Sequence, residues 1–207
     1  VYKRQLQAQI NPHFLYNTLD SIIWMAEGRK YEEVVLMTAS LARLLRQSIS
    51  NEDEVVPLAR EVEYAKGYLT IQKMRYKDKL EFEIDVEPSI LNIPLIKLVL
   101  QPIIENAIYH GLKYKESKGL LQVKGFMKDG NAVLQVIDNG VGMDEETLSH
   151  IYDKHKVNYH SNGVGVYNVQ KRLKLYYGEN YGITYESEKG VGTTATITIP
   201  GIQEESI

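Results

Sequence analysis

The chain has 207 residues, of which 43% are hydrophobic and 25% charged, and a net charge of −3. Such a composition is typical of a globular protein with one large domain or two modest ones. The negative net charge argues against a nucleic-acid partner, and the absence of cysteine excludes disulfides and thiolate metal sites. The longest apolar stretch, residues 90–104, is interrupted by polar residues and prolines, so no segment is expected to span a bilayer.

The first 50 residues are predicted to form two helices. In residues 1–27, side chains recur at three- and four-residue spacing on one stripe: Leu6, Ile10, His13, Phe14 and Asn17. Pro12 predicts a local bend, and Gly28 predicts the end of the helix. The second helix covers residues 31–50, with an apolar face of Val34, Met37, Leu41, Leu44 and Leu45. A hairpin of this length cannot bury its face alone, so we expect it to pair with a second copy in a four-helix bundle.

From residue 54 onward, helices and strands are mixed, which predicts an α+β sandwich as a second domain over residues 54–207, after a helical domain over residues 1–53. Helices are expected over 58–76, from Pro94 to Gly111, over 144–153 and over 166–177. Strands are expected over 80–86, 121–126, 132–137, 182–187 and 193–199. Asp129-Gly130-Asn131 predicts a hairpin between the second and third of these strands. Residues 154–162 are expected to be a polar segment, and the tail from 203 to be frayed.

Two segments of the second domain combine carboxylate or amide side chains with a position suited to a ligand. Glu105 and Asn106 lie on an apolar helix, where buried oxygen atoms need partners, and Mg²⁺ prefers oxygen ligands. Asp138 ends a predicted strand and is followed by Gly140 and Gly142. An aspartate there can accept a hydrogen bond from the amine of adenine, while the glycines leave room for a flat base. Taken singly, each segment also fits an ordinary alternative, a solvated helix face for the first and a turn for the second.

Two further segments are rich in glycine. Gly163 and Gly165 come immediately before a predicted helix, whose N-terminus would attract phosphate groups. Gly190, Gly192 and Thr193 lie between the last two strands and, taken alone, indicate a turn.

The order of the four segments resembles the ATP-binding fold shared by gyrase, Hsp90, histidine kinases and MutL, known as the GHKL or Bergerat fold, over residues 54–200. The resemblance implies an α/β sandwich that binds ATP and Mg²⁺, with Asn106 on the metal and Asp138 reading adenine. The other residues that it implies at the nucleotide are Gly140, Gly142, Gly163, Gly165 and Thr193.

The predicted helical hairpin of the first 50 residues indicates which member of this group the chain resembles. Residues 9–19, Gln-Ile-Asn-Pro-His-Phe-Leu-Tyr-Asn-Thr-Leu, resemble the phosphoacceptor helix of LytS/YesM-like sensor histidine kinases, and the pattern from Val56 to Arg75 is also typical of them. This resemblance implies that His13 is phosphorylated from ATP, with Asn17 orienting its ring, and that the phosphoryl group passes to an aspartate of a response regulator receiver domain. It also implies a homodimer formed through the hairpin, and a membrane-anchored parent protein of which this chain is the cytoplasmic part.

One departure from the broader histidine kinase pattern bears on mechanism. Phe14 follows His13 where many histidine kinases have an acidic residue that acts as a base, which leaves Glu105 as the candidate base. Lys115 and its neighbouring lysines are interpreted as solvated loop residues. Three alternatives stay open at this point: His13 as a core histidine, a non-catalytic ATP-binding dimeric scaffold, and an ATPase of the GHKL type.

Overall fold

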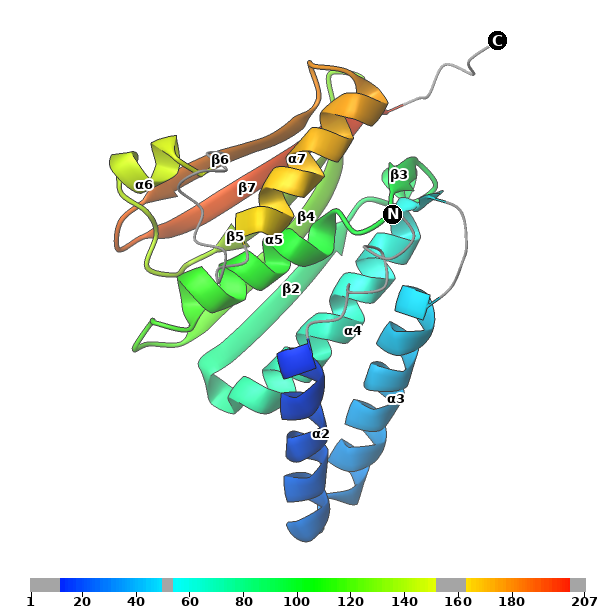
Figure 1. Cartoon of the computed structure of the whole chain (residues 1–207), viewed down its shortest axis with the longest axis vertical. Helices are drawn as coiled ribbons and strands as arrows, with labels where there is room; N and C mark the ends of the chain where they lie inside the picture. The colour runs from blue at the N-terminus through cyan, green and yellow to red at the C-terminus, as the bar shows by residue number, and fades with distance from the viewer. Residues whose placement is uncertain (1–11, 50–53, 152–162, 202–207) are drawn as a thin grey trace.

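A computed structural model describes residues 12–49, 54–151 and 163–201. A helical hairpin is followed by a layered α/β unit (Figure 1). The helices are α2 (Pro12–Glu27), α3 (Tyr31–Ile49), α4 (Leu58–Tyr76), α5 (Leu100–Asn106), α6 (Glu145–Ser149) and α7 (Gly163–Tyr177), with the short turns η2 (Lys77–Lys79), η3 (Pro88–Ile90) and the π-helical η4 (Ala107–Leu112). The strands are β1 (Val55–Pro57), β2 (Leu80–Val86), β3 (Pro94–Ile96), β4 (Gly119–Lys128), β5 (Asn131–Asp138), β6 (Gly182–Glu188) and β7 (Gly192–Pro200). The start of the first predicted helix, the polar segment 154–162 and the tail from 203 lie outside the described residues.

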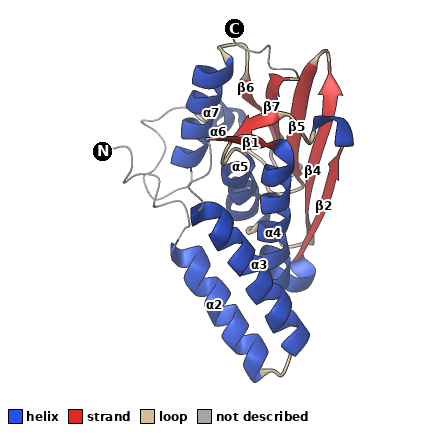
Figure 2. Ribbon diagram, turned by 90° about the vertical axis from the view of Figure 1, so that its right-hand side faces the viewer, coloured by secondary structure: helices blue, strands red, loops and turns tan. Residues whose placement is uncertain are grey.

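Five strands form one sheet in the order β2-β4-β5-β7-β6. β2 and β4 are parallel, so the chain crosses between them through α5, and the other neighbours are antiparallel. Helices α4, α5 and α7 lie on one face of this sheet (Figure 2). Since side chains alternate along a strand, every second residue of β4 from Gly119 to Gly125 is buried. The predicted α+β sandwich is confirmed. No helix among the described residues is both long and apolar enough to cross a membrane.

The hairpin of α2 and α3 packs against α4 of the same chain (Figure 1). Its buried side chains join the core of the α/β unit: Phe14, Met25, Met37, Leu41 and Leu44. We expected a second copy to pair with the hairpin's apolar face, and the sequence did not predict this contact within the chain. A third helix from the same chain already covers part of that face.

The buried stripe of α2 is shifted from the one predicted. Phe14, Thr18 and Met25 are buried, whereas His13 is exposed and Asn17 half-buried. Because neighbouring positions on a helix point about 100° apart, the contact with α4 includes Phe14 and leaves its neighbour His13 outside. The interpretation of His13 as a core histidine is thereby excluded.

Helix α2 ends as predicted near Gly28, but through a different residue. Arg29 has the left-handed φ of 58°, and the backbone N–H of Lys30 donates to the carbonyl of Met25 at 2.9 Å while that of Arg29 donates to Ala26 at 3.0 Å. This pair of bonds is the Schellman arrangement with Arg29 at the left-handed position. The helix therefore ends at Glu27, just before Gly28, and the left-handed residue that terminates it is Arg29 and not the glycine.

The helix expected to begin at Pro94 begins instead at Leu100. Pro94 lies in β3, which pairs with β1, a segment nearly 40 residues earlier in the chain. The helix start is fixed by Glu61 of α4, whose carboxylate accepts hydrogen bonds from the backbone N–H groups of Leu98, Val99 and Leu100 at 2.8, 2.9 and 3.1 Å. These groups have no partner within a helix of their own, so a carboxylate from another helix satisfies them.

The β4–β5 hairpin follows its sequence signal. Asp129 and Gly130 have φ of 50° and 77°, the left-handed pair that a two-residue type I′ turn requires. The two strands extend to Lys128 and Asn131 on either side of this turn.

The role of Glu61 gives a test of stability. Glu61→Gln keeps the shape of the side chain but replaces one accepting oxygen by an amide that cannot accept, so buried N–H groups lose a charged partner. We expect a loss of about 2–4 kcal/mol in the free energy of unfolding, measured by urea denaturation. Glu63→Gln is the control on the same helix, since Glu63 pairs with Arg43 at the surface and its loss is expected to cost less than about 1 kcal/mol. Equal losses in the two variants would contradict the capping role.

Candidate functional site

The structure brings Asn17 and His13 together, as their spacing of four residues on one helix predicts. Asn17 Nδ2 lies 3.0 Å from Nδ1 and 3.1 Å from Nε2 of the imidazole. Ser21 and Thr18 donate their hydroxyls to backbone carbonyls within the same helix, so neither competes for the ring. The arrangement leaves an exposed imidazole with an amide beside it.

Asp138 lies at the end of β5 on the sheet face that the helices cover. Its cross-strand neighbours are Leu121 on β4 and Thr193 on β7, and Ser187 on β6 continues the same row. Asp138 as a whole is 5% exposed, and its carboxyl accepts a hydrogen bond from the backbone N–H of Gly140 at 2.8 Å and another from that of Thr193. Burial raises the pKa of Asp138 to about 6, against the opposing effect of these two bonds and of the Lys115 ammonium. The hydroxyl of Thr193 bonds to Ser187 at 2.9 Å, so Thr193 supports Asp138 through its backbone.

Glycines let three backbone segments approach Asp138. A Cβ on Gly111, at the end of η4, would lie 2.7 Å from Oδ1 of Asp138, and one on Gly192 would lie 2.0 Å from its carbonyl oxygen. Gly140 is packed in the same way, since its Cβ would lie 2.4 Å from the carbonyl carbon of Gly111. Any side chain at these positions would push a backbone segment away from the carboxylate.

Gly142 holds the loop after β5 against the turn between β6 and β7. Its φ is +63°, and a Cβ would lie 1.9 Å from the carbonyl oxygen of Glu188. Val141 links the loop to both sides, because its N–H donates to Gly111 at 3.1 Å and its carbonyl accepts from Gly190 at 2.7 Å. The Asp-x-Gly-x-Gly spacing is thus explained by backbone packing, whatever ligand the loop binds.

Asn106 is the last residue of α5, and its side-chain oxygen is a candidate metal ligand. Oδ1 of Asn106 is buried and has no hydrogen-bond partner among the described residues. A buried amide oxygen without a donor is costly, and a hard cation such as Mg²⁺ is a partner of suitable chemistry. The residues present therefore fit the ion.

Glu105 precedes Asn106 and is held in place within α5. Its Oε1 accepts a hydrogen bond from Nε2 of Gln101 at 2.8 Å. Burial raises the pKa of Glu105, with the Gln101 bond acting in the opposite direction. A carboxylate in this state is a better proton acceptor than a fully solvated one.

The glycines 163 and 165 lie inside α7, so the prediction that they precede the helix is wrong. Gly165 is in the first turn, and a Cβ on it would lie 3.2 Å from Cβ of Pro102 in α5. The two helices therefore approach closely at this point. Residues 152–162, which the sequence places next to these glycines, lie outside the described residues.

Lys115 and Gly111 belong to the site although the sequence marked neither. Lys115 was expected in a solvated loop, but its ammonium donates to the carbonyl oxygen of Asn139 and acts on Asp138. Gly111 was interpreted only as a helix end. The signal that could have identified it is its position five residues after Asn106, at the end of the same predicted helix.

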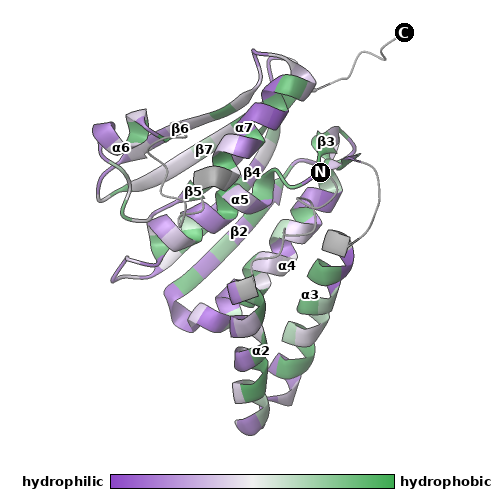
Figure 3. Ribbon diagram, in the orientation of Figure 1, coloured by the Kyte–Doolittle hydropathy of each residue, from purple (hydrophilic) through white to green (hydrophobic). Residues whose placement is uncertain are grey.

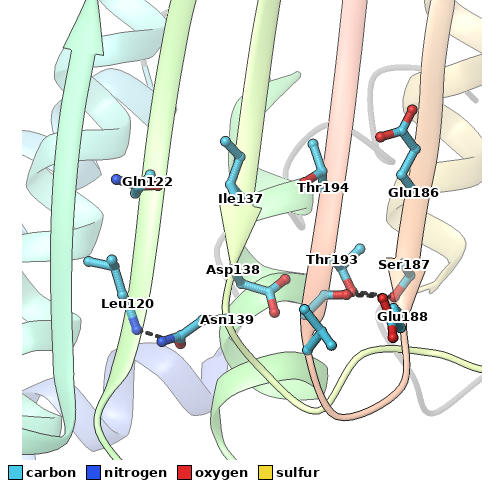
Figure 4. Close-up of a pocket in the computed structure, with 12 residues that line it drawn as sticks. Leu120, Gln122, Ile137, Asp138, Asn139, Glu186, Ser187, Glu188, Thr193 and Thr194 are labelled. Carbon is cyan, nitrogen blue, oxygen red and sulfur yellow. Dashed lines mark hydrogen bonds between the residues drawn. The ribbon is translucent and has the colours of Figure 1, made fainter.

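A cavity of about 550 Å³ lies at the end of the sheet where Asp138 is found, and Figure 4 draws the residues that line it. Its lining includes a row of cross-strand neighbours, Gln122, Ile137, Thr194 and Glu186, and at its end also Asp138 and Thr193. Since the residues of that row alternate with the row of Leu121, Asp138 and Thr193, the cavity opens on the face away from the helices. The candidate nucleotide site lies on the other face, where the Asp138 carboxyl packs against Gly111.

Comparisons with known proteins agree with this geometry. A family model described as histidine kinase matches residues 3–80, and one described as histidine kinase-, DNA gyrase B-, and HSP90-like ATPase matches residues 92–203. The chain is 36% identical over 197 residues to the sensor histidine kinase YesM of Bacillus subtilis, covering 95% of this chain and 33% of that protein. It is 35% identical over 182 residues to the sensor protein LytS of Oceanobacillus iheyensis, covering 86% of this chain and 31% of that protein.

Among solved structures, the chain is similar to the histidine kinase domain of a blue-light activated histidine kinase from Erythrobacter litoralis. The TM-score is 0.53 at 15% identity, with 95% of this chain and 92% of that chain covered, a likeness of fold alone. The chain spans about a third of the length of the curated relatives that it matches.

The raised pKa of Asp138 predicts how stability varies with pH in the absence of nucleotide. An aspartate whose pKa is about 6 when folded and 3.8 otherwise binds its proton more tightly in the folded state, so its contribution to stability falls as pH rises from about 4 through 6. Asp138→Asn removes the buried charge and should therefore gain about 2–3 kcal/mol at pH 7.5 but little at pH 4.

The measurement is the melting temperature of both proteins across this pH range. Asp129→Asn, in the exposed β4–β5 turn, is the matched control and should shift little at any pH. A gain from Asp138→Asn that does not depend on pH would show that the buried charge is not its cause.

Proposed function

The chain belongs to the sensor histidine kinase family, with LytS- and YesM-type proteins as relatives, and on that basis we propose that it phosphorylates its own His13 from ATP and passes the phosphoryl group to an aspartate of a response regulator receiver domain. The observation that carries the proposal is that one chain contains both a candidate phosphoacceptor and a candidate nucleotide site. An exposed His13 with Asn17 beside its ring precedes an α/β unit whose buried Asp138 and orphaned Asn106 oxygen suit a nucleotide and its cation.

In the proposed reaction, a ring nitrogen of His13 attacks the γ-phosphorus of ATP. The bond from that phosphorus to the bridging oxygen breaks, ADP leaves, and the other ring nitrogen releases its proton. Asn17 holds the ring in one orientation, which lowers the entropic cost of the attack. Glu105 is the candidate acceptor of the proton, because burial makes its carboxylate more basic.

Nucleotide recognition is assigned to the residues around Asp138. Its carboxylate accepts the adenine amine, Gly140 and Gly142 let the base approach, and Thr193 holds the carboxylate in place. Asn106 would hold Mg²⁺, and this ion when bound supplies charge neutralisation on the phosphate oxygens. Gly163 and Gly165, in the first turn of α7, are assigned to the phosphates, since a helix N-terminus presents free N–H groups.

We assign residues 1–53 to dimerisation and phosphoacceptance and residues 54–207 to ATP binding. Of the twelve large hydrophobic residues that are exposed in the described part of the chain, seven lie on the hairpin: Tyr16, Leu19, Ile23, Trp24, Tyr31, Val35 and Leu36. Figure 3 shows hydrophobic segments on both helices. A second copy of the hairpin is the proposed cover for these side chains, and a longer membrane-anchored sensor protein is the proposed parent.

The central test is transfer of label from γ-labelled ATP in the presence of Mg²⁺. The wild-type chain should acquire a label that is stable in base and lost in acid, as expected for a phosphoramidate, and His13→Gln should acquire less than about a hundredth as much. Asp20→Asn, an exposed change on the same helix, should be labelled normally.

Each rival function has its own outcome in this experiment. Nucleotide bound without labelled protein indicates a scaffold, and phosphate released without labelled protein indicates an ATPase. Equal labelling of wild type and His13→Gln would refute the proposal. Label that a receiver domain removes from the wild-type protein would support the second step.

The dimer is tested by charging the exposed apolar surface of α2. Ile23 is 57% exposed, so Ile23→Glu should leave the monomer fold intact but place two charges in the proposed interface. We expect light scattering to show a dimer for wild type and a monomer for the variant at micromolar concentration. Leu175→Glu, at a 77% exposed position on α7, should remain a dimer. A monomeric wild type, or a dimeric Ile23→Glu, would argue against a dimer built through α2.

A further inference from the structure

Phe14, directly after His13, is packed against the α/β unit. Its side chain is 5% exposed, and its ring stacks on that of Tyr68 in α4 with 5.0 Å between centroids and 29° between planes. Stacked pairs contribute about 0.5–1.5 kcal/mol beyond the area that they bury. The hydroxyl of Thr18 donates to the Phe14 carbonyl at 2.7 Å, so the backbone next to His13 is held as well.

Tyr68 belongs to α4, which also packs against α5 of the candidate nucleotide site. It is 2% exposed, and its hydroxyl accepts a hydrogen bond from Nε2 of Gln72 at 2.7 Å. Burial raises the pKa of Tyr68 well above its usual value, and the charge of nearby Glu105 adds to the effect. Tyr68 thus lies on a helix, α4, that contacts both the acceptor helix α2 and α5, which carries Glu105 and the candidate metal ligand Asn106.

A second contact involves Lys77, the residue that follows α4 and begins η2. The ammonium of Lys77 is 4.4 Å from the centroid of the Trp24 ring, near the other end of α2. Phe14 and Trp24 are ten residues apart on α2, and their partners Tyr68 and Lys77 follow in the same order, so α2 and α4 run in the same general direction, at an angle to each other (Figure 1). Trp24 is exposed, whereas the Phe14–Tyr68 pair is enclosed. The enclosed pair is therefore the contact that fixes position.

We propose that Phe14 and Tyr68 are positioning residues, which together hold the acceptor helix, and with it His13, in a fixed placement against the ATP-binding unit. The inference rests on the proposed autophosphorylation of His13. Neither residue is assigned contact with the phosphoryl group. Both act by keeping the imidazole, whose own side chain is exposed, in one place relative to α5.

The expected signature follows from this role. Loss of the stacked pair leaves Asp138, Asn106 and their backbone contacts intact, so the affinity for ATP should not change. Placement of the nucleophile is lost, and misplacement of reacting groups by about 1 Å costs up to about a hundredfold in rate. We therefore expect Phe14→Ala and Tyr68→Ala to lower kcat for autophosphorylation by roughly tenfold to a hundredfold with KM for ATP within about twofold of wild type.

Three further variants separate positioning from general stability. Tyr68→Phe keeps the ring and should retain most of kcat. Met25→Ala removes another buried side chain of α2, one that is 2% exposed, and should keep kcat although it also costs stability. The double variant Phe14→Ala/Tyr68→Ala should be little slower than either single one, since both remove the same contact.

The outcomes distinguish this inference from the proposed function. If wild type acquires no acid-labile label, the proposed function fails. If wild type is labelled and Phe14→Ala matches its kcat, or the two alanine effects simply multiply, the positioning role is overturned. Where circular dichroism shows that an alanine variant does not fold, Phe14→Leu and Tyr68→Leu replace it, because they retain apolar volume but not the stacked rings. Normal kcat in both leucine variants would equally overturn the proposal.

Discussion

The buried carboxylate of Asp138 requires three backbone segments to meet without side chains between them. The end of η4, the loop after β5 and the start of β7 each contribute a glycine: Gly111, Gly140 and Gly192. Two backbone N–H groups bond to the carboxylate but do not offset the whole cost of its burial, because its pKa remains raised. A carboxylate has about four acceptor positions, so capacity remains for a donor from a ligand. The spacing of these glycines in the sequence is therefore required by backbone packing, independently of any ligand that the region binds.

Glu61 is a second buried carboxylate, and its different environment shows what distinguishes a structural acid from a candidate binding one. Glu61 accepts three backbone N–H groups at the start of α5, all from one segment. This use of its oxygens fixes where α5 begins, and Asn106 lies six residues after that start. Asp138 fixes the opposite side of the same region through the contact with Gly111. The two carboxylates together set the relative position of the candidate metal ligand and the candidate adenine reader.

Local sequence patterns predicted the strands and most helices because those signals are local. The β4–β5 turn depends on Asp129 and Gly130 alone, and β2 shows strict alternation. The start of α5 was misplaced because Pro94 joins a strand pair with residues 55–57, which no local period reveals. The glycines of α7 were placed ahead of the helix because glycine disfavours helix interiors, and the close approach of α5 to Gly165 outweighs that preference. Whether His13 is exposed depends on which face of α2 packs against α4. A sequence stripe that includes both His13 and Phe14 does not determine that face.

Phe14 at the position after the histidine has a consequence for the proton. A residue that is buried against Tyr68 leaves no charged group next to His13 in sequence, so under the proposed function the proton acceptor has to come from another segment or from water. Glu105 has the basicity for that task, and it lies on the helix that carries the candidate metal ligand. The phosphoacceptor His13 and the base would then lie on two different structural units, the helical hairpin with α2 and the α/β unit with α5, and both helices contact α4. Phosphoryl transfer would require these units to be docked, since neither unit holds both the nucleophile and its base. An acidic residue beside the histidine would place both groups on one helix and would not impose that requirement.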